Sequence, residues 1–91
     1  MKIEGDTIVF KSGKSFFEKE RSGKKPNTVR MVEYDEYKKI INLYGADGLT
    51  KIRIELVEKP SECFERELTD ISLVGIFCGK VCFVFSWRHE E

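Results

Sequence analysis

The second half of this sequence alternates apolar and polar residues, and this alternation limits the fold more than any other feature. Between residues 51 and 58 every second side chain is apolar, at Ile52, Ile54 and Leu56. The same spacing returns near the C-terminus at Val81, Phe83, Phe85 and Trp87. Because successive side chains of a β-strand point to opposite faces, both segments are predicted to be strands with one face toward a core. Trp87 could instead stack on a nucleobase, but the strand spacing favours a place in the core.

Two further strands are predicted between these segments. Residues 64–69 and 71–78 each have strand-like composition, and the second has enough apolar residues to be buried on both faces. Lys59-Pro60-Ser61 predicts the turn before them, since proline is typical of turns and interrupts strands. Gly79-Lys80 predicts a two-residue hairpin turn after them. The second half is therefore expected to be a run of four antiparallel strands.

The first half begins with a predicted hairpin. Gly5-Asp6 suits a two-residue turn between strands at residues 1–4 and 7–11, because glycine and aspartate tolerate positive φ. A single strand is predicted later, over residues 27–32. Its apolar residues Val29 and Met31 lie two apart and are expected to face the core.

Two short helices are predicted around that strand. Ser15, with Glu18 three positions later, has the spacing of a capping box, so a helix is expected over residues 16–22. Gly23 is a suitable residue to end it.

The second helix is predicted over residues 35–44, with Asp35 as its cap and Gly45 at its end. Its apolar residues follow the i, i+3, i+4, i+7 pattern of one helix face: Tyr37, Ile40, Ile41 and Tyr44. This face is expected to pack on the core. The alternative is an exposed face that binds a partner, which would make the chain a protein–protein interaction module.

These elements together predict an α+β fold. The chain has 91 residues, of which 41% are hydrophobic and seven are Phe, and this suits one domain over residues 1–91. So many strands in so short a chain are expected to curl or close, because free strand edges invite unwanted pairing. The expected architecture is a small, mainly antiparallel β-barrel with two short helices.

Composition also limits the compartment and the chemistry. No apolar run approaches the roughly 20 residues that cross a bilayer, and no secretory signal is apparent, so a cytoplasmic location without membrane contact is expected. The three cysteines, Cys63, Cys78 and Cys82, are an odd number and are expected to be reduced. No pair has metal-binding spacing, and the single His89 lies near the C-terminus. No metal and no cofactor are predicted.

The net charge is zero, but the charges are unevenly distributed. Residues 11–30 hold seven basic and two acidic residues, a balance of +5, whereas residues 31–91 hold eight basic and twelve acidic residues, a balance of −4. A basic segment on an acidic body can face phosphate or another anion. The alternative is an ordinary solvated helix and loop.

Residues 23–30 combine several groups that can recognise a ligand. Lys25 is predicted to lie in the turn after the first helix, and Pro26 prevents the chain from continuing as helix. Thr28 and Arg30 lie two apart and are expected to share one strand face. A cation, a hydroxyl and a guanidinium side by side suit an anion, a carbonyl oxygen or a nucleobase edge.

The pattern Gly-x-Lys-x-x-Thr-x-Arg at these positions resembles the signature of the ASCH domain family. The matching residues are Gly23, Lys25, Thr28 and Arg30, preceded by Phe16, Phe17 and Glu20. The match covers the first third of the chain, and residues 64–71 also resemble the strand and turn that end many such domains. ASCH domains are small β-barrels related to the RNA-binding PUA fold. The resemblance implies a pocket for RNA or a nucleotide-like ligand, with Lys25, Thr28 and Arg30 as ligand-binding residues. Lys24, from the basic segment, is the fourth predicted ligand-binding residue and is expected to contact phosphate.

One branch of that family implies a second possibility. Its members are amidohydrolases that act on N4-acetylcytidine, with the motif lysine as base, the motif threonine as nucleophile and a distant glutamate. By position these are Lys25 and Thr28, with Glu55, Glu65 and Glu67 all open as the third residue. This sequence departs from the family pattern after the motif, where a charged helix replaces the usual Gly-Asp pair.

Overall fold

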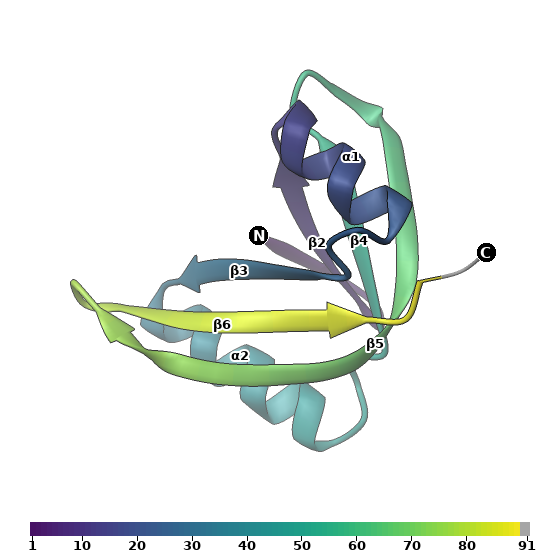
Figure 1. Cartoon of the computed structure of the whole chain (residues 1–91). Helices are drawn as coiled ribbons and strands as arrows, with labels where there is room; N and C mark the ends of the chain where they lie inside the picture. Colours follow the sequence, from purple (N-terminus) through teal and green to yellow (C-terminus); the bar gives the residue numbers. More distant parts are fainter. Residues whose placement is uncertain (90–91) are drawn as a thin grey trace.

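The computed structural model describes residues 1–89 and has an α+β architecture of six strands and two helices (Figure 1). The elements in chain order are β1 (Lys2–Glu4), β2 (Thr7–Ser12), α1 (Lys14–Ser22), β3 (Asn27–Val32), α2 (Tyr34–Gly45), β4 (Lys51–Leu56), β5 (Lys59–Phe77) and β6 (Lys80–Trp87). The predicted fold class, a mainly antiparallel sheet with two short helices, is confirmed. No helix within residues 1–89 is long and apolar enough to cross a membrane.

The strands form one sheet in the order β1-β2-β4-β5-β6-β3. All neighbouring pairs are antiparallel except β2 and β4, which run parallel with Ile8 beside Ile52 and Phe10 beside Ile54. β1 and β3 are the two ends of this order, so the sheet is not closed into a barrel. It is instead strongly curved, and the two halves lie at a steep angle to each other in Figure 1.

The curvature follows from β5, which is one strand of 19 residues and not the two that the sequence predicts. Its first half pairs with β4 and its second half pairs with β6. The register shifts between Leu68 and Asp70 and again between Leu73 and Gly75. Such bulges bend a strand and increase its twist, so β5 passes from one half of the sheet to the other without a break.

The turns at both ends of β5 differ from the prediction. The first lies at Val57-Glu58, and Pro60 lies within the strand. In the pairing of β5 with β4, Lys59 lies opposite Leu56, and the next pair is Cys63 opposite Glu55. Pro60 therefore lies in a stretch without paired residues, where its missing N–H costs no hydrogen bond between the strands. The second turn is Cys78-Gly79 instead of Gly79-Lys80.

The hairpin turn at Cys78-Gly79 has positive φ at both central residues, 52° and 78°. Positive φ at both central positions is the requirement of a type I′ turn, which matches the twist of the flanking strands. Glycine therefore takes the second central position and not the first. The predicted Gly5-Asp6 turn is confirmed, with a φ of 61° at Gly5.

Both helices begin differently from the prediction. Gly13 precedes α1 with no side-chain cap, so Ser15 and Glu18 do not form the predicted capping box. The capping box belongs to α2, where Glu33 is the N-cap and Glu36 closes it; Asp35 is not the cap. The end of α1 at Gly23 is confirmed, since this glycine adopts a left-handed conformation with φ 86°.

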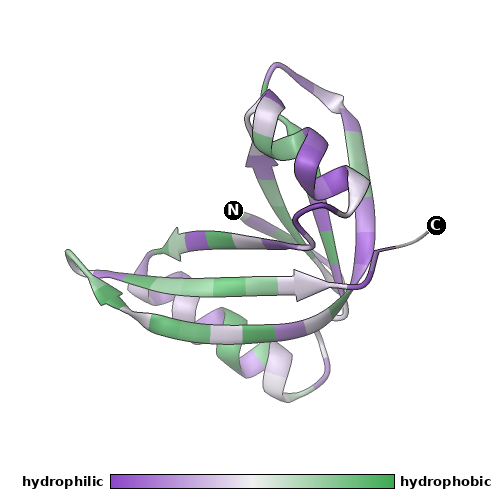
Figure 2. Ribbon diagram, in the orientation of Figure 1, coloured by the Kyte–Doolittle hydropathy of each residue, from purple (hydrophilic) through white to green (hydrophobic). Residues whose placement is uncertain are grey.

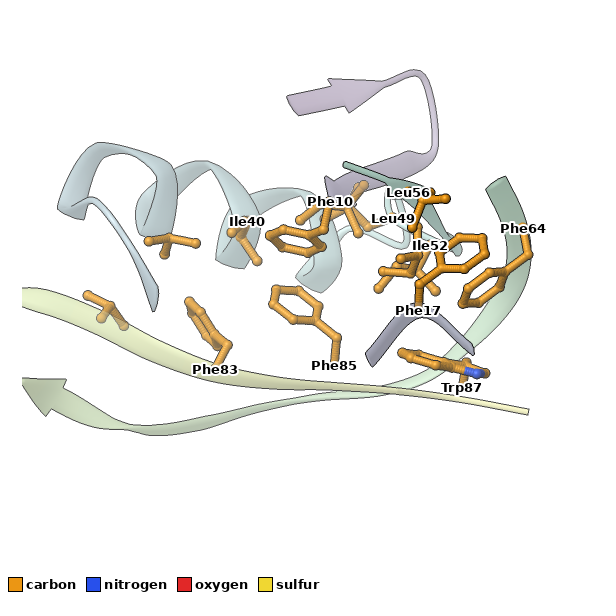
Figure 3. Close-up of a cluster of buried hydrophobic side chains, with 14 residues drawn as sticks. Phe10, Phe17, Ile40, Leu49, Ile52, Leu56, Phe64, Phe83, Phe85 and Trp87 are labelled. Atoms are coloured by element: carbon orange, nitrogen blue, oxygen red, sulfur yellow. The ribbon is translucent and has the colours of Figure 1, made fainter. Parts of the chain in front are cut away.

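The core lies between the two halves of the curved sheet and under both helices (Figure 3). The alternate residues of β4 and β6 are buried as predicted, and Trp87 belongs to the core with 4% of its surface exposed. Phe10 from β2 meets Phe85 from β6 with ring centroids 4.9 Å apart, and such aromatic contacts contribute beyond the area they bury. The apolar face of α2 packs inward through Ile40 and through Tyr37, which stacks on Phe83 at 5.9 Å, but Ile41, which was predicted to share this face, is 42% exposed.

Two further predictions about burial are wrong. Val29 and Met31 point away from the core and are 56% and 49% exposed, while Thr28, on the opposite face of β3, is 3% exposed. Residues 71–78 are not buried on both faces, because this end of β5 extends beyond the core. Figure 2 shows apolar residues continuing to the tip of the β5–β6 hairpin.

Candidate ligand-binding site

The candidate site lies where β3 comes close to β2, although these two strands belong to different halves of the sheet. Arg30 of β3 spans the space between them. Its Nη1 donates to the backbone oxygen of Lys11 at 2.7 Å, and its Nη2 donates to Ser12 Oγ at 2.5 Å. The guanidinium therefore joins two strands that have no ladder hydrogen bonds to each other in the sheet order.

Thr28 and Arg30 share one face of β3, as the sequence predicts. Arg30 Nε donates to Thr28 Oγ1 at 2.9 Å, and the guanidinium lies over the Phe10 ring at 5.0 Å. Burial lowers the pKa of Arg30, and the negative charge of Glu20 partly opposes this. An arginine remains protonated despite such a shift, so a fixed positive charge is held in a shielded place.

Glu20 is the site residue that was not assigned a role from the sequence. It lies on α1 one turn after Phe17, and both side chains face inward, with Glu20 only 1% exposed. Its Oε1 accepts a hydrogen bond from Ser12 Oγ at 2.8 Å. Glu20 follows Phe17 by three residues, and residues three apart share one face of a helix. This spacing was the feature of the sequence from which the burial of Glu20 could have been predicted.

Lys25 lies in the turn that follows α1 and approaches Glu20 from the opposite side. Its Nζ is 3.7 Å from Glu20 Oε2 and donates to the backbone oxygen of Asn27 at 3.1 Å. The same amine lies 5.8 Å from the centre of the Phe16 ring, which is 57% exposed. Lys25 is thus anchored but still reaches the surface.

These side chains surround one open pocket of about 440 Å³. Its lining is Lys11, Ser12, Gly13, Phe16, Glu20, Lys25, Thr28, Val29 and Arg30. The two cations Lys25 and Arg30 outnumber the single carboxylate Glu20, which leaves the pocket with an excess of one positive charge. The exposed Lys11 adds another at the rim. Exposed Val29, on the outer face of β3, supplies part of the apolar wall.

Lys24 does not line this pocket. It lies beside the outer surface of α1, in a shallow depression formed with Ser15, Glu18, Lys19 and Ser22. The structure therefore brings together three of the four predicted ligand-binding residues and places the fourth on an adjacent surface.

The residues expected for catalysis are close in space but bond to other groups. Thr28 Oγ1 accepts from Arg30, and Lys25 bonds to Asn27 and pairs with Glu20. Within residues 1–89 no hydrogen bond joins Lys25 to Thr28. The carboxyl group that reaches the pocket belongs to Glu20 and not to the residues that the sequence left open.

Those three glutamates lie elsewhere. Glu55 pairs with Arg53 at 3.3 Å and lines a neighbouring pocket, and Glu65 and Glu67 lie beside Arg66. None of the three lines the pocket that holds Lys25 and Thr28.

Searches of family models, of curated proteins and of solved structures find no match to this chain.

Proposed function

We propose that this chain binds RNA or a nucleotide-like ligand, with a base in the pocket between α1, β2 and β3 and phosphates on the surrounding lysines. One observation carries the proposal: a carboxylate that is 1% exposed, Glu20, is held with Arg30 and Lys25 around an open pocket. Buried charged groups are costly, and such clusters in a concave surface are typical of binding sites.

The interior of the pocket suits a nucleobase better than a bare anion. A carboxylate can accept about four hydrogen bonds, and two protein groups, Ser12 and Lys25, face that of Glu20. Exocyclic amines of nucleobases are donors that carboxylates bind, and a shift of the partly exposed Lys25 side chain would open Glu20, which is 1% exposed, to such a donor. The exposed Phe16 ring at the rim offers a surface on which a base can stack.

The surroundings of the pocket suit phosphate. Lys11 lines the rim, and Lys14, Lys19 and Lys24 are exposed on α1 and the turn after it. Contacts of this kind supply affinity without sequence preference and weaken as salt rises. The excess of one positive charge inside the pocket acts in the same direction.

The resemblance to ASCH domains supports the same function. Lys25, Thr28 and Arg30, three of the motif residues, line one pocket, and Gly23 gives the turn that places Lys25 there. On this proposal the chain is a divergent ASCH/PUA-like domain, with a strongly curved sheet in place of the closed barrel of that family.

The test is fluorescence anisotropy with a short labelled single-stranded RNA, repeated over a series of salt concentrations. We expect binding that weakens steeply with salt, and Lys24→Ala should reduce the slope of log affinity against log salt by about one. Lys39→Ala on α2, an exposed lysine outside the pocket, is the matched control and should leave the slope unchanged. Absence of binding to RNA and to all four mononucleotides at low salt would refute the proposal.

Hydrolysis of N4-acetylcytidine is a second candidate, favoured by the position of Glu20. Lys25 and Thr28 line the same pocket, and Glu20 supplies a third polar group beside Lys25. Attack by the Thr28 hydroxyl requires Lys25 to leave Asn27 and reach the hydroxyl by a rotamer change. Release of cytidine by the parent protein, abolished in both Lys25→Ala and Thr28→Val, would establish the enzyme. No turnover in the parent protein would retire it.

A further inference from the structure

The outer half of β5 has a free edge. Pairing with β4 ends at Glu67, while pairing with β6 continues from Leu68 to Phe77. Residues 68–77 therefore have β6 on one side, and within residues 1–89 no strand lies on the other (Figure 1). Along this edge alternate backbone N–H and C=O groups point outward, as they do on any edge strand.

Large apolar side chains project from both faces of this segment. Leu73 lies opposite Phe83 and Ile76 lies opposite Val81. Because opposed residues of paired strands point to the same face, Leu73 and Ile76 share the face of the sheet that carries the core residues Phe83 and Val81. Phe77 pairs with Lys80 and lies on the opposite face. Four side chains are more than half exposed: Leu73 at 56%, Val74 at 53%, Ile76 at 68% and Phe77 at 51%.

From residue 71 to 77 this edge has no charged residue and no proline to prevent pairing, although the register shift between Leu73 and Gly75 is a bulge that interrupts its regularity. Natural edge strands carry lysine, proline or inward-pointing charges that prevent contact with another strand. Residues 71–79 contain no charged residue and no proline, although 35% of the chain is charged. Whatever covers this edge must present an extended backbone, apolar side chains on both faces and no charge.

We propose that residues 71–77 pair antiparallel with the same segment of a second copy of this chain. The segment itself meets all three requirements, so the edge is complementary to itself, as a two-fold symmetric interface demands. A register that sets Leu73 of one copy beside Ile76 of the other keeps both side chains on the same face. The two curved sheets then join into one continuous sheet through their β5 strands.

The exposed area is consistent with a dimer. Four side chains that are each about half exposed leave on the order of 400 Å² of apolar surface, a size at which a patch marks an interaction site. A standard interface buries about 800 Å² per partner, so these four side chains supply about half of that area, which suits a weak dimer that dissociates on dilution.

This interface is separate from the candidate ligand site. In the outer half of the sheet β6 lies between β5 and β3, so the free edge of β5 faces away from β3. None of residues 71–77 lines the ligand pocket. A dimer formed through β5 therefore leaves both pockets open, and dimerisation does not depend on ligand binding.

Sedimentation velocity over a range of protein concentrations tests the proposal. The parent chain should sediment as a dimer at high concentration and dissociate on dilution, whereas Leu73→Lys and Ile76→Lys should remain monomeric throughout. Val57→Lys is the matched control, since Val57 is 53% exposed at the turn before β5 and lies off the edge; it should still dimerise. A monomeric parent chain at every concentration, or lysine variants that dimerise as the parent does, would overturn the proposal.

Disulfide trapping gives a second measurement that does not depend on the lysine variants folding. Opposed residues of antiparallel strands have Cβ atoms about 4.5–5.5 Å apart, close enough for a disulfide after a small adjustment. The variant Leu73→Cys, Ile76→Cys, with the exposed Cys78 changed to Ser, should form a covalent dimer under oxidising conditions. The same chain carrying only Cys78→Ser should not, and equal yields from the two chains would contradict the proposed register.

Discussion

Arg53 on β4 and Arg30 on β3 are both partly shielded from solvent, but their charges are balanced in different ways. Arg53 contacts Glu4 at 2.8 Å and Glu55 at 3.3 Å, and Glu4 also pairs with Lys2. Burial alone acts to lower the pKa of Arg53, but the hydrogen bond and charge of Glu4 and the charges of neighbouring glutamates outweigh it and raise that pKa. This cluster has two cations and two carboxylates, so its charges balance.

Arg30 donates instead to three neutral oxygens, on Thr28, Lys11 and Ser12. Its carboxylate, Glu20, is reached through Ser12 and is shared with Lys25. Burial is here the dominant effect, and the pKa of Arg30 is lowered. An arginine can therefore make a hydrogen bond from each of its three nitrogens and still leave a positive charge unbalanced, and the pocket between α1, β2 and β3 is the one lined by this unbalanced cluster.

The sharpest way to break this comparison is to replace each arginine by methionine. Arg30→Met leaves the buried Thr28 hydroxyl and Ser12 without their donor and should lower the free energy of unfolding by about 2 kcal/mol. Arg53→Met removes partly exposed ion pairs and should lower the free energy of unfolding by about 1 kcal/mol or less. Urea denaturation of both variants measures the difference.

The same pair of variants tests binding. Arg30→Met should weaken RNA binding by about 10-fold or more, since a hydrogen-bonded charge contributes roughly 1.5–3 kcal/mol, while Arg53→Met should leave it unchanged. Equal losses of stability and of affinity in the two variants would show that the two clusters do not differ in role.

A smaller effect is expected from Glu20→Gln, which removes one charge and keeps an acceptor for Ser12. The pocket then holds two cations and no carboxylate, so its affinity for an anion without a base, such as ribose 5-phosphate, should rise about 3-fold. Preference for amine-bearing bases over uracil should fall. Glu55→Gln in the balanced cluster is the control for isothermal titration calorimetry, and the same gain in that variant would contradict the expectation.

The smallest effect concerns the acid stability given by two exposed carboxylates, Glu4 of the balanced cluster and Asp6 of the β1–β2 turn. The hydrogen bond from Lys2, and then the contacts of Arg53, hold the pKa of Glu4 below its ordinary value of 4.5. The hydroxyls of Thr7 and Thr50 similarly lower the pKa of Asp6 below 3.8. The pKa values of both carboxyl groups are lower in the folded protein than in the unfolded chain. Their ionised forms therefore stabilise the fold fully above the unfolded-state pKa values, and this stabilisation is lost as the pH falls through the folded-state pKa values.

Urea midpoints measured from roughly pH 6 down to pH 3 should therefore decline, and the decline should be shallower in Glu4→Gln and in Asp6→Asn. Both groups are exposed, so the differences should be small. If the urea midpoints of the variants decline with pH in parallel with those of the parent protein, these two carboxylates do not contribute to acid stability.

The sequence predicted most of the elements because their apolar spacing is regular. Val81, Phe83, Phe85 and Trp87 alternate without interruption and are all buried, so the face of β6 followed directly from the pattern. On β3 the same reasoning predicted that the wrong face of the strand is buried. Hydrophobicity favoured Val29 and Met31, but the buried face belongs to Thr28 and Arg30, whose polar groups bond to each other and to β2.

The sequence indicated that Lys25, Thr28 and Arg30 come together, but not which groups connect them. Lys25, Thr28 and Arg30 stand out in the sequence because they form a short motif. The role of Glu20 depends on α1 lying against the half of the sheet that holds β2, and the parallel pairing of β2 with β4 is a long-range contact that local spacing does not encode. The position of Ser12 between Arg30 and Glu20 depends on the same contact.

The bend in β5 has a consequence for how the molecule can move. β2 and β3 belong to opposite halves of the sheet, and β5 is the strand that belongs to both halves. The register shift between Leu68 and Asp70 lies where pairing passes from β4 to β6, so this shift is the joint between the halves. A change of curvature there would alter the separation of β2 and β3, and Arg30 is the side chain that spans it. A change at this joint would therefore alter the width of the pocket without changing any residue that lines it.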